Sequence, residues 1–121
     1  MKIEDIKFKA RKLNSCEWVE GDLVHLGHRV CIGGDHLKDG IADVDPSTVC
    51  QFTGLKDCEG KEIWEGDIVE RVIYDLFKGS AKVKAVIEYM DGAFVAITDG
   101  IPYSLYFKYI KVVGNKFDKE K

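Results

Sequence analysis

The sequence predicts a small, mostly β protein, with α+β as the most helical class that it allows. Apolar residues alternate with polar ones in windows such as Ile6–Arg11 and Val83–Tyr89, which is the period of a half-buried strand. Asp91-Gly92 stands between two β-rich runs, as in a tight type I′ hairpin turn. No window has the apolar spacing of an amphipathic helix of three turns. These observations together favour strands joined by short turns.

The length and composition indicate a single globular domain. The chain has 121 residues, of which 45% are hydrophobic and 32% charged. A chain of this size buries roughly two-thirds of its surface on folding, so it can form its own core. The longest apolar run, Ala93–Ile97, is far shorter than the ~18 residues of a membrane span, and no signal peptide is apparent. We therefore expect a cytoplasmic protein without a membrane partner.

The first 45 residues are expected to form an N-terminal β-unit. A strand around Ile6–Ala10 is followed by extended structure over Glu17–Leu26, which Gly21-Asp22 is expected to break as a turn. A further strand over Arg29–Ile32 ends at two glycines. Residues Asp35–Ser47 contain four Asp, a Gly and a Pro, and read as an irregular connection that holds the boundary between the two parts.

Residues 46 to 121 are expected to form a second β-unit. It includes a strand over Asp67–Tyr74, and the Asp91-Gly92 hairpin, whose register places Tyr89 opposite Phe94. Asp99-Gly100 predicts another turn, and Lys111–Val113 a last strand.

Two similar motifs occur in the two units, Trp18-Val19-Glu20-Gly21-Asp22 and Trp64-Glu65-Gly66-Asp67. Glycine accepts a left-handed φ, and Asp hydrogen-bonds nearby backbone N–H groups, so Gly21, Asp22, Gly66 and Asp67 are predicted to be structural turns. The alternative, a pair of carboxylates for hydrolysis, is less favoured. Because Gly-Asp before an apolar strand recurs in small SH3-like barrels, we expect the N-terminal β-unit to pack on a partly open SH3-like barrel.

The stretch Gln51–Val69, QFTGLKDCEGKEIWEGDIV, resembles the signature of the YopX family, small proteins of phage and prophage origin. Three further segments resemble the family's other motifs in the same order: Ile6–Ala10, Trp18–Leu23 and Ile110–Asn115. The resemblance implies a fold and a biological context. It implies no activity and no catalytic residues.

One group of residues has the types that bind metals: His25, His28, Cys31 and His36. On a strand, however, residues three apart point to opposite faces, which argues against a shared site. The four cysteines contain no C-x-x-C pair, and Cys31 and Cys50 lie in apolar patterns typical of the core. We predict no metal and no cofactor.

No phosphate loop, dinucleotide fingerprint or nucleophile elbow is present, so we predict that the protein is not an enzyme. Its net charge of −3 is distributed unevenly, because residues 35 to 70 hold ten acids and three lysines, while the two ends are rich in lysine. Such a distribution can steer charged partners, but an ordinary solvated surface is the favoured interpretation.

The expected function is a non-catalytic phage or prophage accessory role, exerted by binding another protein or by homo-oligomerisation. The expected partner surface combines basic residues of the first strand with tyrosines, although the core is the favoured place for these rings. Its residues are Lys7, Lys9, Arg11, Tyr103, Tyr106 and Tyr109. The alternative function is a nucleic-acid-binding module that uses the basic termini and the Tyr103–Tyr109 aromatics. The net acidity disfavours it, because non-specific nucleic-acid affinity needs a concentrated basic surface.

Overall fold

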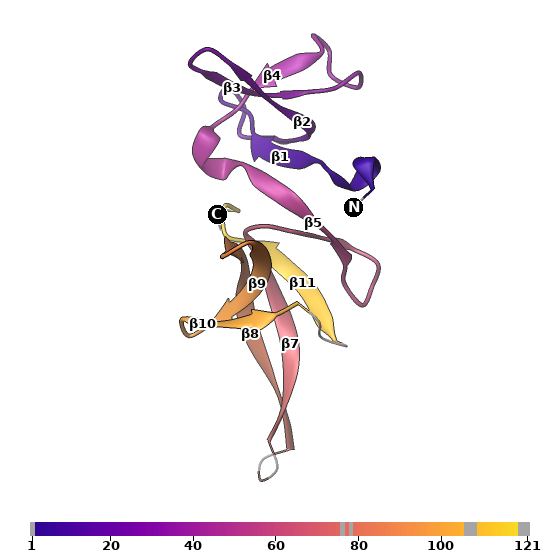
Figure 1. Cartoon of the computed structure of the whole chain (residues 1–121), viewed down its shortest axis with the longest axis vertical. Helices are drawn as coiled ribbons and strands as arrows, with labels where there is room; N and C mark the ends of the chain where they lie inside the picture. The colour runs from indigo at the N-terminus through magenta and orange to yellow at the C-terminus, as the bar shows by residue number, and fades with distance from the viewer. Residues whose placement is uncertain (1, 76, 78, 106–108, 119–121) are drawn as a thin grey trace. The chain divides into compact units, whose positions relative to one another are not determined.

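The computed structural model describes residues 2–75, 77, 79–105 and 109–118. It confirms a mostly β protein with two antiparallel sheets (Figure 1). The chain divides into two compact units, Met1–Gly54 (unit 1) and Leu55–Lys121 (unit 2).

The first sheet has the strand order β4-β3-β2-β1-β5-β6. Its strands are β1 Phe8–Arg11, β2 Trp18–Leu26, β3 Arg29–Gly33, β4 Ile41–Asp43, β5 Cys50–Lys56 and β6 Glu62–Trp64. Short 3₁₀ turns occur at Ile3–Asp5 and Pro46–Thr48. The core of unit 1 consists of Ala10, Val19, Ile32 and Val44, with Phe8, Leu23, Val30, Leu37 and Val49 packed against it. Strand β1 corresponds to the strand predicted around Ile6–Ala10, but it begins at Phe8. Ile6 precedes it and is 46% exposed.

Gly21 and Asp22 do not form the predicted turn. Strand β2 runs through them without a break, with Gly21 opposite Phe8 and Asp22 opposite Gly33. A Cβ atom at Gly21 would collide with the carbonyl oxygen of Gly33. The glycine is thus needed for the close approach of two backbones within the sheet, a role that local sequence cannot distinguish from a turn.

Unit 1 extends beyond the boundary expected after residue 45. Asp45 caps the Pro46–Thr48 turn by accepting hydrogen bonds from the backbone N–H and hydroxyl of Ser47. The N–H of Arg11 then donates to Thr48 Oγ1 at 2.9 Å, and the N–H of Phe52 donates to the Lys7 carbonyl at 3.0 Å. These bonds join Thr48 and Phe52 to strand β1 and to Lys7 just before it, and the compact unit ends at Gly54. The expected irregular connection also contains a short strand, β4.

The second sheet has the order β10-β9-β8-β7-β11, with β8 in the centre. Its strands are β7 Asp67–Asp75, β8 Gly79–Met90, β9 Ala93–Thr98, β10 Ile101–Ser104 and β11 Ile110–Asn115. The hairpin prediction is confirmed, because Asp91 and Gly92 both have positive φ, 51° and 86°. Tyr89 lies opposite Phe94, and the two rings meet edge to face at 5.4 Å.

Unit 2 folds this sheet around its own core. The buried residues are Ile63, Val69, Ala85, Ile87, Ala96, Ile110 and Val112. The Arg71 guanidinium on β7 lies 3.8 Å from the ring centroid of Tyr103 on β10. In a flat sheet these residues would stand at least about 14 Å apart, because three strand spacings separate β7 from β10. The sheet is therefore strongly curled, with its core on the concave side. Whether it is an SH3-like barrel stays a prediction.

Candidate interaction surfaces

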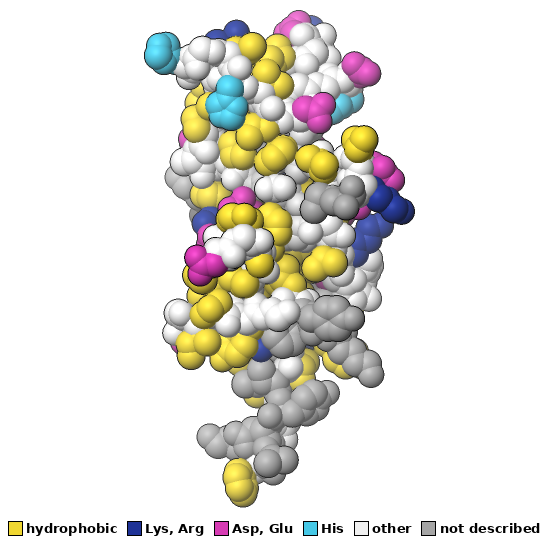
Figure 2. Space-filling model, viewed as in Figure 1, with side chains coloured by type: hydrophobic (Ala, Val, Ile, Leu, Met, Phe, Trp, Pro, Cys, Tyr) yellow, Lys and Arg dark blue, Asp and Glu magenta, His cyan; other side chains and the backbone are white. Residues whose placement is uncertain are grey.

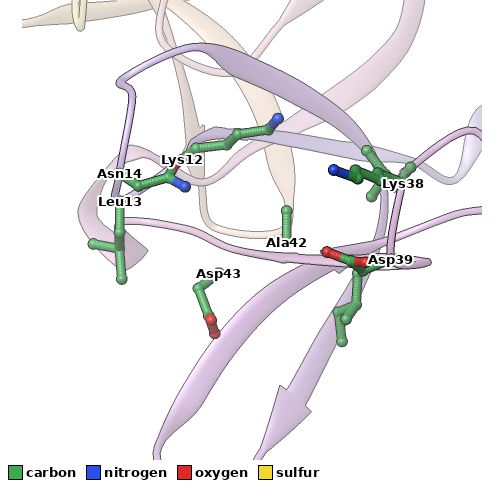
Figure 3. Close-up of a pocket in the computed structure, with 9 residues that line it drawn as sticks. Lys12, Leu13, Asn14, Lys38, Asp39, Ala42 and Asp43 are labelled. Carbon is green, nitrogen blue, oxygen red and sulfur yellow. The ribbon is translucent and has the colours of Figure 1, made fainter.

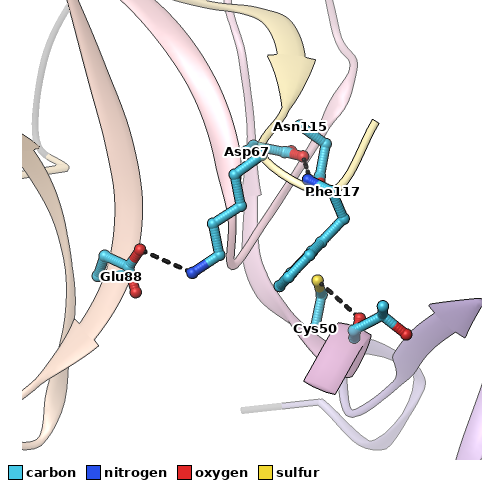
Figure 4. Close-up of polar contacts among 7 residues, drawn as sticks. Cys50, Asp67, Glu88, Asn115 and Phe117 are labelled. Carbon is cyan, nitrogen blue, oxygen red and sulfur yellow. Dashed lines mark hydrogen bonds and ion pairs between the residues drawn. The ribbon is translucent and has the colours of Figure 1, made fainter. Parts of the chain in front are cut away.

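The Gly66-Asp67 motif carries a turn. Gly66 adopts φ +85°, and the buried Asp67 carboxylate accepts a hydrogen bond from the Trp64 N–H at 2.8 Å. It also accepts one from the Asn115 amide at 3.0 Å (Figure 4). Both carboxylate oxygens thus hold parts of unit 2 together. This arrangement gives Asp67 a structural explanation in place of the hydrolytic pair considered from the sequence.

A second buried carboxylate, Asp57, plays the same part in the preceding turn, before β6, and the sequence analysis did not single it out. Asp57 accepts hydrogen bonds from the backbone N–H groups of Glu59, Lys61 and Val112 at 2.8–2.9 Å. Burial acts to raise the pKa of Asp57, but these three donors outweigh it and hold the pKa below its usual value. The only sequence signal was an Asp three residues before Gly60, typical of a turn.

The four residues with metal-binding side chains occupy separate positions. His25 and His28 are exposed, whereas Cys31 is fully buried. The imidazole of His36 is hydrogen-bonded to the Glu20 carbonyl oxygen at 2.6 Å. Within the described part of the chain, no group of three His, Cys, Asp or Glu side chains is arranged to hold a metal ion.

The Cys31 thiol takes part in a different contact. It donates to Asp43 Oδ1 at 3.3 Å, and Arg29 Nε donates to the same oxygen at 2.9 Å. Burial, together with the carboxylate, raises the pKa of Cys31. This thiol is therefore a poor nucleophile and a poor metal ligand.

The basic residues of β1, and Lys7 just before it, stack on aromatic rings of the neighbouring strands. Lys7 Nζ lies 4.8 Å from the centre of the Phe52 ring, and Lys9 Nζ lies 4.8 Å from that of Trp18. The Arg11 guanidinium lies 5.2 Å from the Trp18 ring, because Arg11 and Trp18 are register partners. We call this set the cation–aromatic surface; its partly exposed members are Lys7, Lys9, Arg11 and Trp18, and Phe52 is buried beneath Lys7. Sequence reasoning identified its cations but missed its rings.

A pocket of about 550 Å³ opens beside this surface. Its walls include Lys7, Trp18 and Glu20, together with His36 and Leu37 from the loop after β3. A second pocket, of about 460 Å³, lies between the β1–β2 turn and the β3–β4 loop. Figure 3 shows Lys12 and Lys38 extending toward each other across it, with Asp39 beside Lys38.

The tyrosines of the expected partner surface belong to unit 2, whereas Lys7, Lys9 and Arg11 belong to unit 1. Tyr103 is half-buried on β10 beneath Arg71, and Tyr109 is 52% exposed just before β11. These two strands form opposite ends of the strand order in the second sheet. Tyr106 lies outside the described residues.

The convex side of the second sheet presents an apolar row that the sequence analysis did not foresee. Ile68, Val86, Ile97 and Pro102 are successive register partners on β7, β8, β9 and β10. The first three are half-buried and Pro102 is exposed. Hydrophobic side chains gather over the β8–β10 part of unit 2 in Figure 2. We call this convex side the outer face.

No helix in the described residues is long and apolar enough to cross a membrane. The fold and these surfaces define a small, two-unit, antiparallel β protein. Its buried carboxylates accept hydrogen bonds from turns and strands. Its sequence matches the YopX protein family over residues 3–120, and the chain therefore belongs to that family. No curated protein sequence matches the chain.

Proposed function

We propose that this chain is a non-catalytic accessory protein of a phage or prophage, which binds another protein in the cytoplasm of the bacterial host. The observation that carries the proposal is the cation–aromatic surface of unit 1. Three cations are held at stacking distance over two rings, next to a pocket that includes Lys7 and Trp18. Stacking orders long basic side chains before a partner arrives, which lowers the entropic cost of binding.

The chemistry of this surface suits an acidic protein segment that carries an apolar or aromatic side chain. Carboxylates would meet Lys7, Lys9 and Arg11, and an apolar group would enter the pocket beside Trp18. The buried acids Asp57 and Asp67 do not take part in this surface, because their carboxylates accept hydrogen bonds from backbone N–H groups and an amide of unit 2. Family membership supports the phage context, since the YopX resemblance implies it.

The experiment is affinity capture with matched baits from bacteria that carry the prophage. The wild-type chain is compared with Lys9→Glu/Arg11→Glu and with the control Lys56→Glu/Lys61→Glu, which makes the same charge change at exposed sites of unit 2. We expect the wild type and the control to retain one stoichiometric protein, unaffected by nuclease, and the Lys9/Arg11 variant to lose it. Equal retention by all three baits would contradict the proposal.

A second candidate function is single-stranded nucleic-acid binding on the same surface. A half-exposed Trp18 flanked by Lys9 and Arg11 is a stacking platform with phosphate partners. It ranks second because the chain is acidic overall and Glu20 stands opposite Lys9 in the register. A salt titration with random single-stranded and duplex DNA distinguishes the two candidates. Tight, steeply salt-dependent binding that the Lys9/Arg11 variant loses would favour nucleic acid.

A further inference from the structure

The outer face of unit 2 has a charge pattern that is complementary to itself. Along the central strand β8, the residues that point to this face are Lys82, Lys84, Val86, Glu88 and Met90. The intervening Ala85 and Ile87 are buried in the core, which establishes the orientation of the set. Two basic residues thus precede Val86 on this face, and an acidic residue follows it. Lys84 and Glu88 lie at equal distances on either side of Val86, two residues away along β8.

Val86 also lies in the apolar row Ile68–Val86–Ile97–Pro102, which crosses four strands at right angles to β8. The row is flanked on one side by Lys84 and on the other by Glu88. Lys84 stands opposite Glu70 in the β7–β8 register, and Glu88 pairs with Lys116 at 3.0 Å (Figure 4). The pairs Lys84–Glu70 and Lys116–Glu88 are partly exposed at the margin of the row. Their charges are therefore accessible to a molecule that binds on the row.

A two-fold axis along the apolar row would place two outer faces together with their β8 strands antiparallel. This operation puts Val86 against Val86 of the second copy and Lys84 against its Glu88, twice in the dimer. An axis along β8 would instead oppose Lys84 to a second Lys84, which is repulsive. The pattern therefore selects one symmetric arrangement, with an apolar centre between two pairs of opposite charges.

We propose that a second copy of this chain docks on the outer face of unit 2, in a two-fold dimer centred on Val86. The inference rests on the proposed protein-binding role, for which it names a second copy as one partner. This partner would bind the outer face and not the cation–aromatic surface. The charges of the face are complementary to those of the same face on another molecule, which a second copy requires and an unrelated partner does not.

The test is a charge swap read by sedimentation equilibrium of the full chain. We expect a wild-type dimer, and a dissociation constant raised about tenfold or more in Lys84→Glu and in Glu88→Lys, because each places like charges opposite each other. The double variant Lys84→Glu/Glu88→Lys should restore the dimer. An equimolar mixture of the two single variants should form heterodimers, since both contacts then join opposite charges.

Lys61→Glu and Glu59→Lys, in an exposed turn of unit 2, are matched controls and should dimerise like the wild type. Far-UV circular dichroism shows whether each variant is folded, and heterodimer formation in the mixture requires that both are. A monomeric wild type, single variants that dimerise normally, or a folded double variant that stays monomeric would each overturn the inference. None of these results affects the proposed function, which the Lys9→Glu/Arg11→Glu bait tests separately.

Discussion

At the scale of single residues, the buried carboxylates explain much of the local structure. Asp57 joins its own turn to Val112, which lies on strand β11, and Asp67 joins the Gly66 turn to Asn115. In each case one acid satisfies backbone or amide donors that would otherwise be buried without an acceptor. These residues hold the turns in place by hydrogen bonding, and substitutions there should change stability more than any surface property.

The first prediction concerns Asp57 and pH. Its folded-state pKa is lowered, so its contribution to stability is present above the unfolded value of about 3.9 and is lost as the pH falls through the folded value. Asp57→Asn should cost on the order of 2 kcal/mol near pH 7, because hydrogen bonds to a charged acceptor weaken. Urea unfolding at several pH values should show this difference shrinking below about pH 4. A difference that is independent of pH would contradict the assignment.

The second prediction concerns Gly66, whose φ of +85° disfavours a β-branched side chain. Gly66→Val should destabilise the protein by about 1–3 kcal/mol, measured by chemical denaturation. Gly114→Val is the control, since a Cβ at Gly114 meets no atom within 4 Å. If Gly66→Val melts like the parent but loses a partner, the motif is a binding site and not a turn.

At the scale of elements, strand β2 depends on a close backbone approach in its middle. Gly21 faces β3 where an added Cβ would strike the Gly33 carbonyl, whereas a Cβ on Gly33 itself would meet its nearest atom, in Val24, at 3.4 Å. The long continuous strand places Trp18 beside Arg11 at one end and Leu26 beside Arg29 at the other. Its integrity therefore supports both the core of unit 1 and the cation–aromatic surface.

The third prediction follows from this asymmetry. Gly21→Ala should force β2 and β3 apart and cost on the order of 1–3 kcal/mol, while Gly33→Ala should cost less. Thermal unfolding of the two variants in parallel gives the comparison. Equal melting temperatures for the two would show that the strands adjust without strain and would remove the explanation for this glycine.

At the scale of the whole molecule, each unit has its own core and its own exposed surface. Unit 1 carries the cation–aromatic surface on β1 and β2, and unit 2 carries the apolar row on the outer face of its sheet. The surfaces differ in chemistry, so the two proposed partners would contact different units.

The fourth prediction concerns metal removal. Incubation with a strong chelator should leave the far-UV circular dichroism and the melting temperature unchanged, because the described residues contain no arrangement of three metal-binding side chains. Metal analysis after gel filtration is the complementary measurement. A stoichiometric metal that survives gel filtration would point back to His25, His28, Cys31 and His36.

Much of the fold could be predicted from the sequence, because alternation and turn chemistry are local. The Asp91-Gly92 turn and the pairing of Tyr89 with Phe94 follow from a few neighbouring residues, and so does the class of the fold. The motif at Gly21-Asp22 shows the limit of this reasoning. A Gly-Asp dipeptide makes a turn at residues 66–67, but at residues 21–22 it lies inside a strand that closely approaches its neighbour.

Only the tertiary structure decided the candidate sites, because each depends on strand register between distant segments. The stacking of Arg11 on Trp18 requires the pairing of β1 with β2, and the contact of Arg71 with Tyr103 requires the curl of the sheet. The apolar row and the opposed charges around Val86 likewise arise only when β7, β8, β9 and β10 are aligned. A one-residue slip would turn every one of these side chains to the other face, and the local sequence does not specify the register between distant strands.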